Sequence, residues 1–107
     1  VVSAKFEFND DVITIGRNPD NTIVIDDMSV SGVHGKFLRE ADPYYEGHHR
    51  YYLQDMGSTN GSMVNNKPVE RQELKNNDNV KIGWIEFKFI GDDFQQHEAT
   101  AHILKEQ

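Results

Sequence analysis

The 107 residues are 36% hydrophobic and 27% charged, which suffices for one globular domain whose core closes by packing alone. The chain has no cysteine, so disulfides and zinc-thiolate sites are excluded. With 18 acidic and 11 basic side chains the net charge is -7, which argues against a general affinity for nucleic acid or an anionic membrane.

No apolar run approaches the roughly 20 residues that cross a bilayer, and the initial stretch VVSAKFEFND lacks the basic and apolar halves of a signal peptide. We therefore expect a soluble, intracellular protein of the cytoplasm or nucleus. The chain begins at Val1 and not at methionine, as expected of a domain excised from a longer protein or of a processed terminus.

Short runs of alternating apolar and polar residues follow one another along the chain: KFEF, VITI, TIVI, HGKFL, YYLQD, NVKI and WIEFKFI. Each run is bounded by Asn, Asp, Gly or Pro, and a period of two is typical of half-buried β-strands. In the last run, one face carries Ile85, Phe87 and Phe89, and the other carries Glu86 and Lys88. The pattern predicts an all-β antiparallel sandwich or barrel.

Two stretches depart from this alternation. The polar stretch from Glu40 to Arg50 is predicted to be an extended loop between two strands. The stretch from Asp92 to Gln107 has good helix formers, and Ile103 lies four residues after Ala99. We expect a domain over residues 1–91, followed over residues 92–107 by a short helix, a linker to a further domain or a solvated tail.

Several residues are candidates for a binding site, although each alone has an ordinary structural explanation. Arg17 follows Gly16 at a strand end, where its planar set of donors could reach a doubly charged anion. Ser29 and Ser31 lie in the next loop, and hydroxyls there usually cap turns. His34 enters the following strand, where a single histidine is usually structural.

The stretch DMGSTNGSMVNN contains a further candidate. The pair Asn60-Gly61 is a strong hairpin signal, and Ser58 and Thr59 precede it directly. Asn60, Gly61 and Ser62 also match the acceptor pattern for N-glycosylation, but the chain shows no secretory signal, so a turn is the better interpretation.

Together these elements resemble the forkhead-associated (FHA) family of phosphothreonine-binding modules. The matching blocks are IGR at Ile15 to Arg17, VSGVH at Val30 to His34, DMGSTNGSMVNN at Asp55 to Asn66, and LKNNDNVKIG at Leu74 to Gly83. The four blocks occur in the family's order and cover roughly Val1 to Gly91. The resemblance implies a two-sheet antiparallel β-sandwich of the FHA/SMAD type, with about eleven strands and with ligand-binding loops at one end.

The resemblance also implies a role for each matching residue. Arg17 would pair with the phosphate, Ser31 and Thr59 would donate hydrogen bonds to it, and Asn60 would hold the peptide backbone. His34 would be structural and keep these loops in register. Further phosphopeptide contacts are implied for Ser58, Gly32 and Ser29, and structural support for Gly16, Gly57 and Gly61.

The sequence departs from the family pattern beside the loop serine. The family often has a basic or amide residue after that serine and a basic residue two positions before it, where this chain has Gly32 and Ser29. Because Asp26 and Asp27 are also near, we expect the third peptide residue after the phosphothreonine to be apolar or basic rather than acidic. Asn66 replaces a frequent glycine, which asparagine tolerates because it enters the left-handed region.

Two other kinds of site are weaker interpretations. A hydrolase could use Ser31, His34 and Asp55, but no strained elbow such as G-x-S-x-G is present. A metal site at His48 and His49 with Glu46 is disfavoured, because adjacent histidines of a strand point to opposite faces and no third ligand is evident in the sequence.

We therefore expect a non-enzymatic, phosphothreonine-dependent peptide-binding module that recruits a phosphorylated protein in signalling. It should need no cofactor or metal and bind neither nucleic acid nor membrane; its oligomeric state stays open, with a monomer favoured. The alternative is an FHA-type scaffold or oligomerisation domain that docks a protein surface without phosphate. Tyr44 and Tyr45, or Ile103 and Leu104, could then provide the contact.

Overall fold

The computed structural model describes residues 2–91 and 101–106, which form strands, turns and loops. This part of the chain contains no helix that could span a membrane. The strands are β1 (Val2–Glu7), β2 (Val12–Gly16), β3 (Ile23–Val24), β4 (Gly35–Ala41), β5 (His49–Asp55), β6 (Ser62–Val64), β7 (Lys67–Pro68), β8 (Arg71–Leu74), β9 (Asn79–Ile82), β10 (Ile85–Ile90) and β11 (His102–Glu106).

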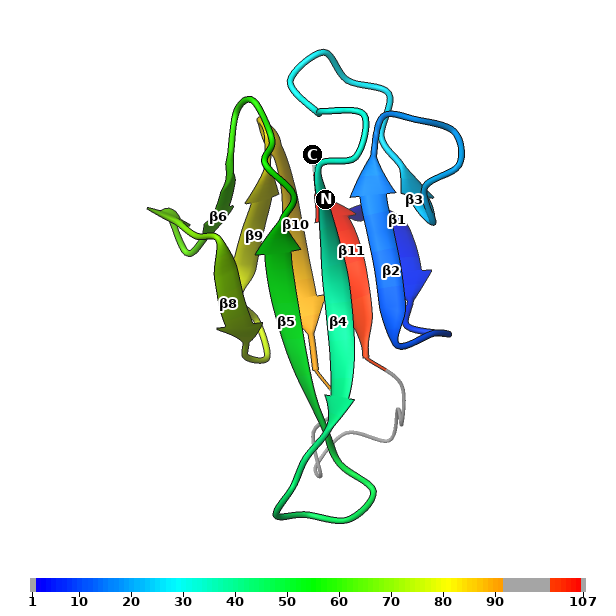
Figure 1. The fold of residues 1–107 in the computed structure, drawn as a ribbon, viewed down its shortest axis with the longest axis vertical. Coiled ribbons are helices and arrows are strands. Elements are labelled where there is room, and N and C mark those ends of the chain that lie inside the picture. The colour runs from blue at the N-terminus through cyan, green and yellow to red at the C-terminus, as the bar shows by residue number, and fades with distance from the viewer. Residues whose placement is uncertain (1, 92–100, 107) are drawn as a thin grey trace.

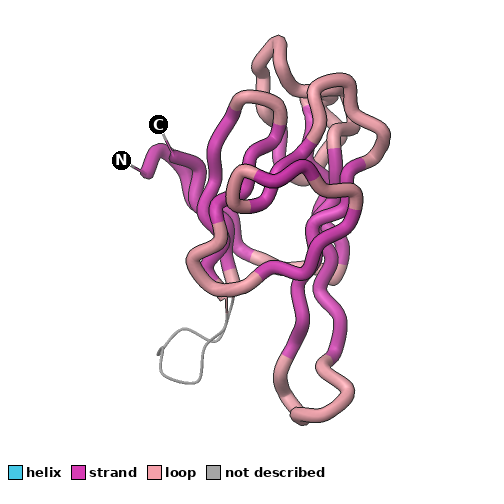
Figure 2. The backbone as a smooth tube through the Cα atoms, turned by 90° about the vertical axis from the view of Figure 1, so that its left-hand side faces the viewer, coloured by secondary structure: helices cyan, strands magenta, loops and turns pink. Residues whose placement is uncertain are grey.

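The strands form two sheets that face each other as a sandwich (Figure 1, Figure 2). One sheet has the order β1-β11-β10-β9-β6-β7 and the other β3-β2-β4-β5-β8. The pairs between described strands are antiparallel, except that the short β3 runs parallel to β2. The predicted all-β sandwich is confirmed, and the seven alternating runs of the sequence contain or overlap β1, β2, β3, β4, β5, β9 and β10.

Aromatic side chains from both sheets meet in the core. Phe8, directly after β1, packs edge-on against Tyr51 with ring centroids 4.9 Å apart and against Phe37 at 6.1 Å. Phe89 of β10 lies 5.3 Å from the Tyr51 ring. Phe87 and Phe89 are buried and Glu86 is exposed, as the alternation in this run predicts.

The loops gather at two opposite ends of the sandwich. The loops 17–22, 25–34 and 56–61 and the β9–β10 turn lie at the upper end in Figure 1, and the β4–β5 connection projects from the lower end. The extended loop expected from Glu40 to Arg50 is shorter than predicted, because Glu40 pairs with Arg50 and Ala41 with His49. Only residues 42–48 connect the two strands.

The predicted hairpin at Asn60-Gly61 is wrong. The 56–61 loop carries the chain from β5 in one sheet to β6 in the other, so it is a crossover between sheets. A tight hairpin lies at Asn65 and Asn66, where β6 turns into β7 with φ of 51° and 67°. Both central residues of such a turn need positive φ, and asparagine tolerates it.

The expected C-terminal helix is also wrong for the described residues. Residues 102–106 form β11, which lies between β1 and β10 and pairs with both. Ile103 is fully buried opposite Phe6 and Phe89. Tertiary pairing overrides local helix propensity here, because β11 provides backbone hydrogen-bond partners for the edges of both β1 and β10. Ala99 and the rest of 92–100 lie outside the described residues.

Candidate functional site

Arg17 lies where β2 ends, held against the loop that carries Ser31. Its N–H donates to the carbonyl oxygen of Ser31 over 2.9 Å. At the neighbouring Gly16 a Cβ would collide with the carbonyl oxygen of Gly32, so the close approach of the two loops requires glycine. The Arg17 side chain is 48% exposed, and its Nε lies 3.6 Å from a carboxylate oxygen of Asp26. A pair this exposed contributes little, so the guanidinium is accessible to an anionic ligand.

Asp27 and His34 fix the 25–34 loop from within. The Asp27 carboxylate accepts hydrogen bonds from the hydroxyl and the N–H of Ser29, at 2.6 and 2.9 Å, and these lower the pKa of Asp27. Nδ1 of the buried His34 accepts the N–H of Ser31 at 3.1 Å. Because an accepting ring nitrogen carries no proton, the proton of the neutral His34 ring is on Nε2.

Asp55 organises the 56–61 loop in a similar way. Its carboxylate accepts the hydroxyls of Ser58 and Ser62 at 2.5 and 2.6 Å, and the N–H of Ser58 at 3.0 Å. Burial raises the pKa of Asp55, but the three hydrogen bonds outweigh burial and leave the pKa below its ordinary value. Because Ser58 Oγ accepts the Gly61 N–H at 3.0 Å, the turn that carries Thr59 is held at both ends.

Three hydrogen bonds with a side chain as donor or acceptor join the 25–34 loop to the 56–61 loop, beside the backbone bond from the Met56 N–H to the His34 carbonyl oxygen at 2.9 Å. They are Thr59 N–H to Ser31 Oγ at 3.0 Å, Asn60 Nδ2–H to the Ser29 carbonyl oxygen at 2.9 Å, and His34 Nε2–H to the Gly61 carbonyl oxygen at 2.8 Å. Contacts within the protein therefore join the loops that carry the predicted site into one connected surface.

This surface lines an open pocket of about 550 Å³. Among the residues that the sequence assigns to phosphopeptide contact, the pocket lining contains Arg17, Ser29, Ser31, Gly32, Thr59 and Asn60. Ser58 lies outside the lining, and its hydroxyl is directed to Asp55. Gly57 and Gly61 have φ of 73° and 82°, which a side chain would disfavour.

The structural role of several residues at this end was not predicted from the sequence. Asp27 caps the 25–34 loop, and Asp55 caps the 56–61 loop. The turn at Gly83 and Trp84 contacts both loops. An aspartate two or three residues before a serine in a polar loop is a recognisable capping signal, so Asp27 and Asp55 could have been predicted. The contacts of Trp84 span 55 positions of sequence and have no local signal.

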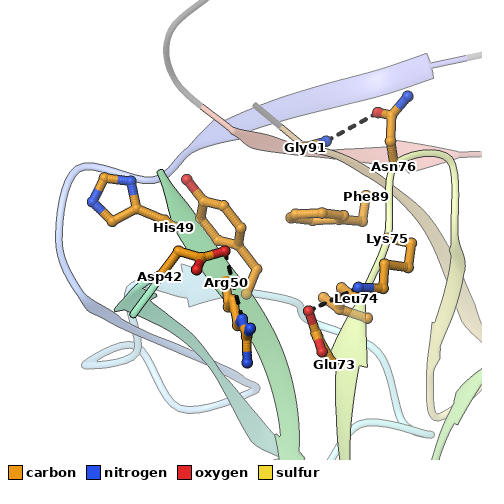
Figure 3. Close-up of a pocket in the computed structure, with 10 residues that line it drawn as sticks. Asp42, His49, Arg50, Glu73, Leu74, Lys75, Asn76, Phe89 and Gly91 are labelled. Atoms are coloured by element: carbon orange, nitrogen blue, oxygen red, sulfur yellow. Dashed lines mark hydrogen bonds and ion pairs between the residues drawn. The ribbon is translucent and has the colours of Figure 1, made fainter. Parts of the chain in front are cut away.

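A second pocket of about 420 Å³ lies at the opposite end of the sandwich (Figure 3). Its cations already have partners in the same pocket. Arg50 Nε lies 3.6 Å from the Asp42 carboxylate, and Lys75 Nζ lies 2.9 Å from Glu73. Its charge is thus compensated from within, so it is less suited to a dianion than the loop pocket.

Comparison with known proteins identifies the family. The chain is 33% identical over 87 residues to the oxoglutarate dehydrogenase inhibitor of Corynebacterium jeikeium, covering 81% of this chain and 56% of the relative. It is also 33% identical over 87 residues to the glycogen accumulation regulator GarA of Mycobacterium tuberculosis, covering 81% and 49%. The chain thus spans about half the length of these curated relatives.

A solved structure has the same fold. The MEK1 FHA domain in complex with a HOP1 phosphothreonine peptide superimposes with a TM-score of 0.66 at 24% identity, over 77% of this chain and 81% of that one. The family model for the FHA domain matches residues 13–83. This chain therefore belongs to the FHA domain family.

Proposed function

We propose that this domain binds a phosphothreonine-containing segment of a partner protein in the pocket between the 25–34 and 56–61 loops. The observation that carries the proposal is the convergence of Arg17, Ser31, Thr59 and Asn60 on one pocket, from three separate loops. A phosphothreonine dianion has three strong acceptor oxygens, so its receptor needs a cation and several neutral donors fixed in advance.

The hydrogen bonds within the site leave suitable groups for the ligand. Ser31 Oγ already accepts the Thr59 N–H, so its own hydroxyl hydrogen can donate to a phosphate oxygen. Asn60 uses Nδ2 to hold the Ser29 carbonyl, so Oδ1 can accept a peptide N–H. Thr59 is exposed at the pocket rim, where its hydroxyl could reach the same phosphate.

The charge of the site favours a modest affinity. Among the described residues, Arg17 is the one basic side chain in the pocket lining, and a dianion would have to displace Asp26 from it. Three or four charge-assisted hydrogen bonds contribute about 1.5 to 3 kcal/mol each. Their sum is of the same size as the association cost of about 4 to 15 kcal/mol, so these bonds alone do not give tight binding. We therefore expect micromolar-class binding to which peptide backbone contacts also contribute.

The contacts of His34 support binding without catalysis. A serine hydrolase would need a ring nitrogen of His34 to accept the hydroxyl proton of Ser31. Here Nδ1 accepts the backbone N–H of Ser31, and Nε2 donates to the Gly61 carbonyl oxygen. Both nitrogens are therefore used to brace the loops, as the family resemblance implies.

The relatives support a regulatory role. Those named as an oxoglutarate dehydrogenase inhibitor and a glycogen accumulation regulator are regulatory proteins, and one structural neighbour holds a phosphothreonine peptide. We infer that the partner of this domain is an intracellular protein modified by a kinase, and that phosphorylation controls the association.

Titration with three versions of one peptide tests the proposal: with phosphothreonine, with unmodified threonine and with phosphoserine. We expect saturable binding of the phosphothreonine peptide, weaker binding of the phosphoserine peptide, because it lacks one methyl group, and no measurable binding of the unmodified peptide. Equal binding with and without phosphate would contradict the proposal and favour a phosphate-independent scaffold.

A further inference from the structure

Asn60 is followed by Gly61 in the 56–61 loop, and this is the single Asn-Gly pair of the chain. In such a pair the backbone nitrogen of the glycine can attack the side-chain amide carbon of the asparagine, because glycine has no Cβ to hinder the approach. Asn60 is also exposed, so water reaches its side chain. The lining of the loop pocket therefore includes a residue that is prone to spontaneous deamidation.

The reaction at Asn60 balances with water alone. The Gly61 nitrogen forms a bond to Cγ of Asn60, the Cγ–Nδ2 bond breaks, and ammonia leaves with the proton of the Gly61 N–H. Water then opens the resulting succinimide at either of its two carbonyl carbons. Opening at Cγ gives aspartate at position 60. Opening at the other carbonyl carbon gives isoaspartate, in which the main chain runs through Cβ and Cγ.

Two hydrogen bonds of the folded loop oppose the first step. The Gly61 N–H donates to Ser58 Oγ at 3.0 Å, which stabilises the proton that this nitrogen must lose. Nδ2–H of Asn60 donates to the Ser29 carbonyl oxygen at 2.9 Å, which fixes the orientation of the amide. A peptide ligand whose N–H bonds to Oδ1 would hold the same side chain more firmly. We therefore expect deamidation to be slowest in the complex.

A carboxylate at position 60 would be unsuited to the proposed ligand. It has no hydrogen to donate to the Ser29 carbonyl oxygen, so two acceptor oxygens would face each other where Asn60 now forms a bond. It also adds a negative charge to a pocket in which Arg17 is the one basic residue of the described lining. The phosphate would then be repelled by the residue that is proposed to hold the peptide backbone.

Isoaspartate would also alter the backbone of the 56–61 loop, because its main chain contains an additional carbon atom. On one side of position 60, the Thr59 N–H donates to Ser31 Oγ at 3.0 Å. On the other side, the Gly61 carbonyl oxygen accepts His34 Nε2–H at 2.8 Å. A longer main chain between these two contacts would have to displace one of them, which weakens the bracing of the loops.

We propose that Asn60 is a modification site at which deamidation ends phosphopeptide binding, and that Ser58 and the bound peptide slow the reaction. The loss of binding rests on the proposed function, whereas the reaction at Asn60 and its control by Ser58 do not. A domain occupied by its phosphorylated partner would keep its binding capacity longer than a free domain.

Incubation of the folded domain at mildly alkaline pH and physiological temperature tests the inference, with tandem mass spectrometry to follow deamidation at each asparagine. The wild type is incubated alone, with a saturating phosphothreonine peptide and with the unmodified peptide. Asn66 is the internal control, because it is exposed in the β6–β7 turn and precedes Lys67 instead of a glycine. Calorimetry measures the phosphopeptide affinity of fresh and incubated wild type and of Asn60→Asp.

Two serine variants separate the Gly61 contact from a general loosening of the loop. Ser58→Ala removes the acceptor of the Gly61 N–H and one hydroxyl donor to Asp55. Ser62→Ala is the matched control, because it also removes a hydroxyl donor to Asp55 but leaves the Gly61 N–H bonded to Ser58. Deamidation at Asn60 should be about twofold to tenfold faster in Ser58→Ala, as expected for loss of one hydrogen bond, and unchanged in Ser62→Ala.

We expect the wild type to deamidate faster at Asn60 than at Asn66. The phosphothreonine peptide should slow the reaction at Asn60, and the unmodified peptide should not. Asn60→Asp should bind the phosphopeptide at least about tenfold more weakly than the wild type. The binding capacity lost on incubation should match the fraction of the domain that is deamidated at Asn60.

Other outcomes would overturn the inference: deamidation no faster at Asn60 than at Asn66, equal rates in Ser58→Ala and Ser62→Ala, no protection by the phosphopeptide, or wild-type affinity in Asn60→Asp. In each of these cases, phosphate-dependent binding by the fresh wild type would still support the proposed function. Equal binding of the phosphorylated and unmodified peptides by the fresh wild type would overturn both the proposed function and the loss of binding inferred here.

Discussion

His34 Nε2–H donates to the carbonyl oxygen of Gly61 over 2.8 Å, across 27 positions of sequence. The same ring accepts the Ser31 N–H on Nδ1, so one buried side chain ties the 25–34 loop to the 56–61 loop. Both contacts are to backbone groups, which fixes the positions of the loops whatever their side chains are. Contacts within the protein thus hold the two loops in place, which reduces the entropy cost of binding.

His34→Ala should lower both stability and phosphopeptide affinity. The substitution removes two hydrogen bonds, leaves the part-buried Ser31 N–H without its acceptor and opens a cavity, so we expect a loss of about 2 to 4 kcal/mol in the free energy of unfolding. Urea denaturation measures this loss. Val33→Ala is the control, because the Val33 side chain is 45% exposed in the same loop and should cost little. A His34→Ala domain that unfolds like the wild type would show that the bracing contacts do not contribute.

Arg17→Ala should weaken binding without affecting the fold. Loss of the cation that we propose to face the phosphate is expected to cost about 2 kcal/mol or more, roughly a 30-fold loss of affinity. The free energy of unfolding should change little, because the Arg17 pair with Asp26 is exposed. Arg71→Ala is a matched control, since that side chain is 50% exposed and pairs with Glu40 on the sheet. Wild-type affinity in Arg17→Ala, measured by calorimetry, would remove the main support for the phosphate site.

Asp26→Asn should have the opposite effect on affinity. The Asp26 carboxylate lies 3.6 Å from Arg17 Nε, so in the proposed complex it would compete with the phosphate for this side chain. Exposed pairs are worth about 0 to 1 kcal/mol, so we expect binding to strengthen by up to about fivefold at low salt, with a smaller gain at high salt. Asp20→Asn makes the same change of net charge in the 17–22 loop and serves as the control. Weaker binding in Asp26→Asn would indicate that the carboxylate helps to orient Arg17.

The strands with clear alternation were predictable from the sequence, whereas the very short strands β6 and β7 and the C-terminal strand β11 were not. The alternation of Phe87 and Phe89 with polar residues is enough to predict β10, and both side chains are buried in the structure. β6 and β7 have three and two residues, too few for a period to be read. β11 was missed because its pairing with β1 and β10 outweighs local propensity.

The candidate site residues stand out only in combination. Arg17, Ser31 and Thr59 are ordinary residues when taken singly, and only the order of four motifs makes them candidates, through the resemblance to a family. The residues that hold these loops in place are harder to predict. Trp84 donates its backbone N–H to Ser29, and any residue type could make such a contact. For the same reason the crossover nature of the 56–61 loop was missed: Asn60-Gly61 has the composition of a hairpin in either topology.

Gly83→Ala should disturb the turn that carries Trp84. Gly83 has φ of 59°, and a Cβ there would collide with the Ser29 carbonyl oxygen. Gly47→Ala separates the two effects, because Gly47 has φ of 80° and nothing within 4 Å of the position of a Cβ. We expect about 1 kcal/mol of destabilisation at Gly47 from conformation alone, and at least 2 kcal/mol at Gly83. Equal losses in thermal or urea unfolding would mean that the turn can move away from Ser29 at no cost.

Asp55 should give the domain a pH-dependent stability. Its pKa in the folded state lies below the ordinary value of 3.8, because Ser58 and Ser62 donate to the ionised carboxylate. A depressed folded pKa adds stability above the pKa of the unfolded chain, and this contribution is lost as the pH falls through the folded value. Wild-type stability should therefore decline from about pH 5 downwards and continue to fall below 3.8.

Urea denaturation at a series of pH values, with Asp55→Asn and Ser62→Ala, would isolate this contribution. Asp55→Asn should be less stable than the wild type at pH 7 and should lose less stability on acidification, because asparagine cannot ionise. Ser62→Ala removes one of the donors that depress the pKa, so its acid sensitivity should lie between the two. If Asp55→Asn lost stability with pH as steeply as the wild type, the acid sensitivity would have to come from other carboxylates, of which Asp27 also has a lowered pKa.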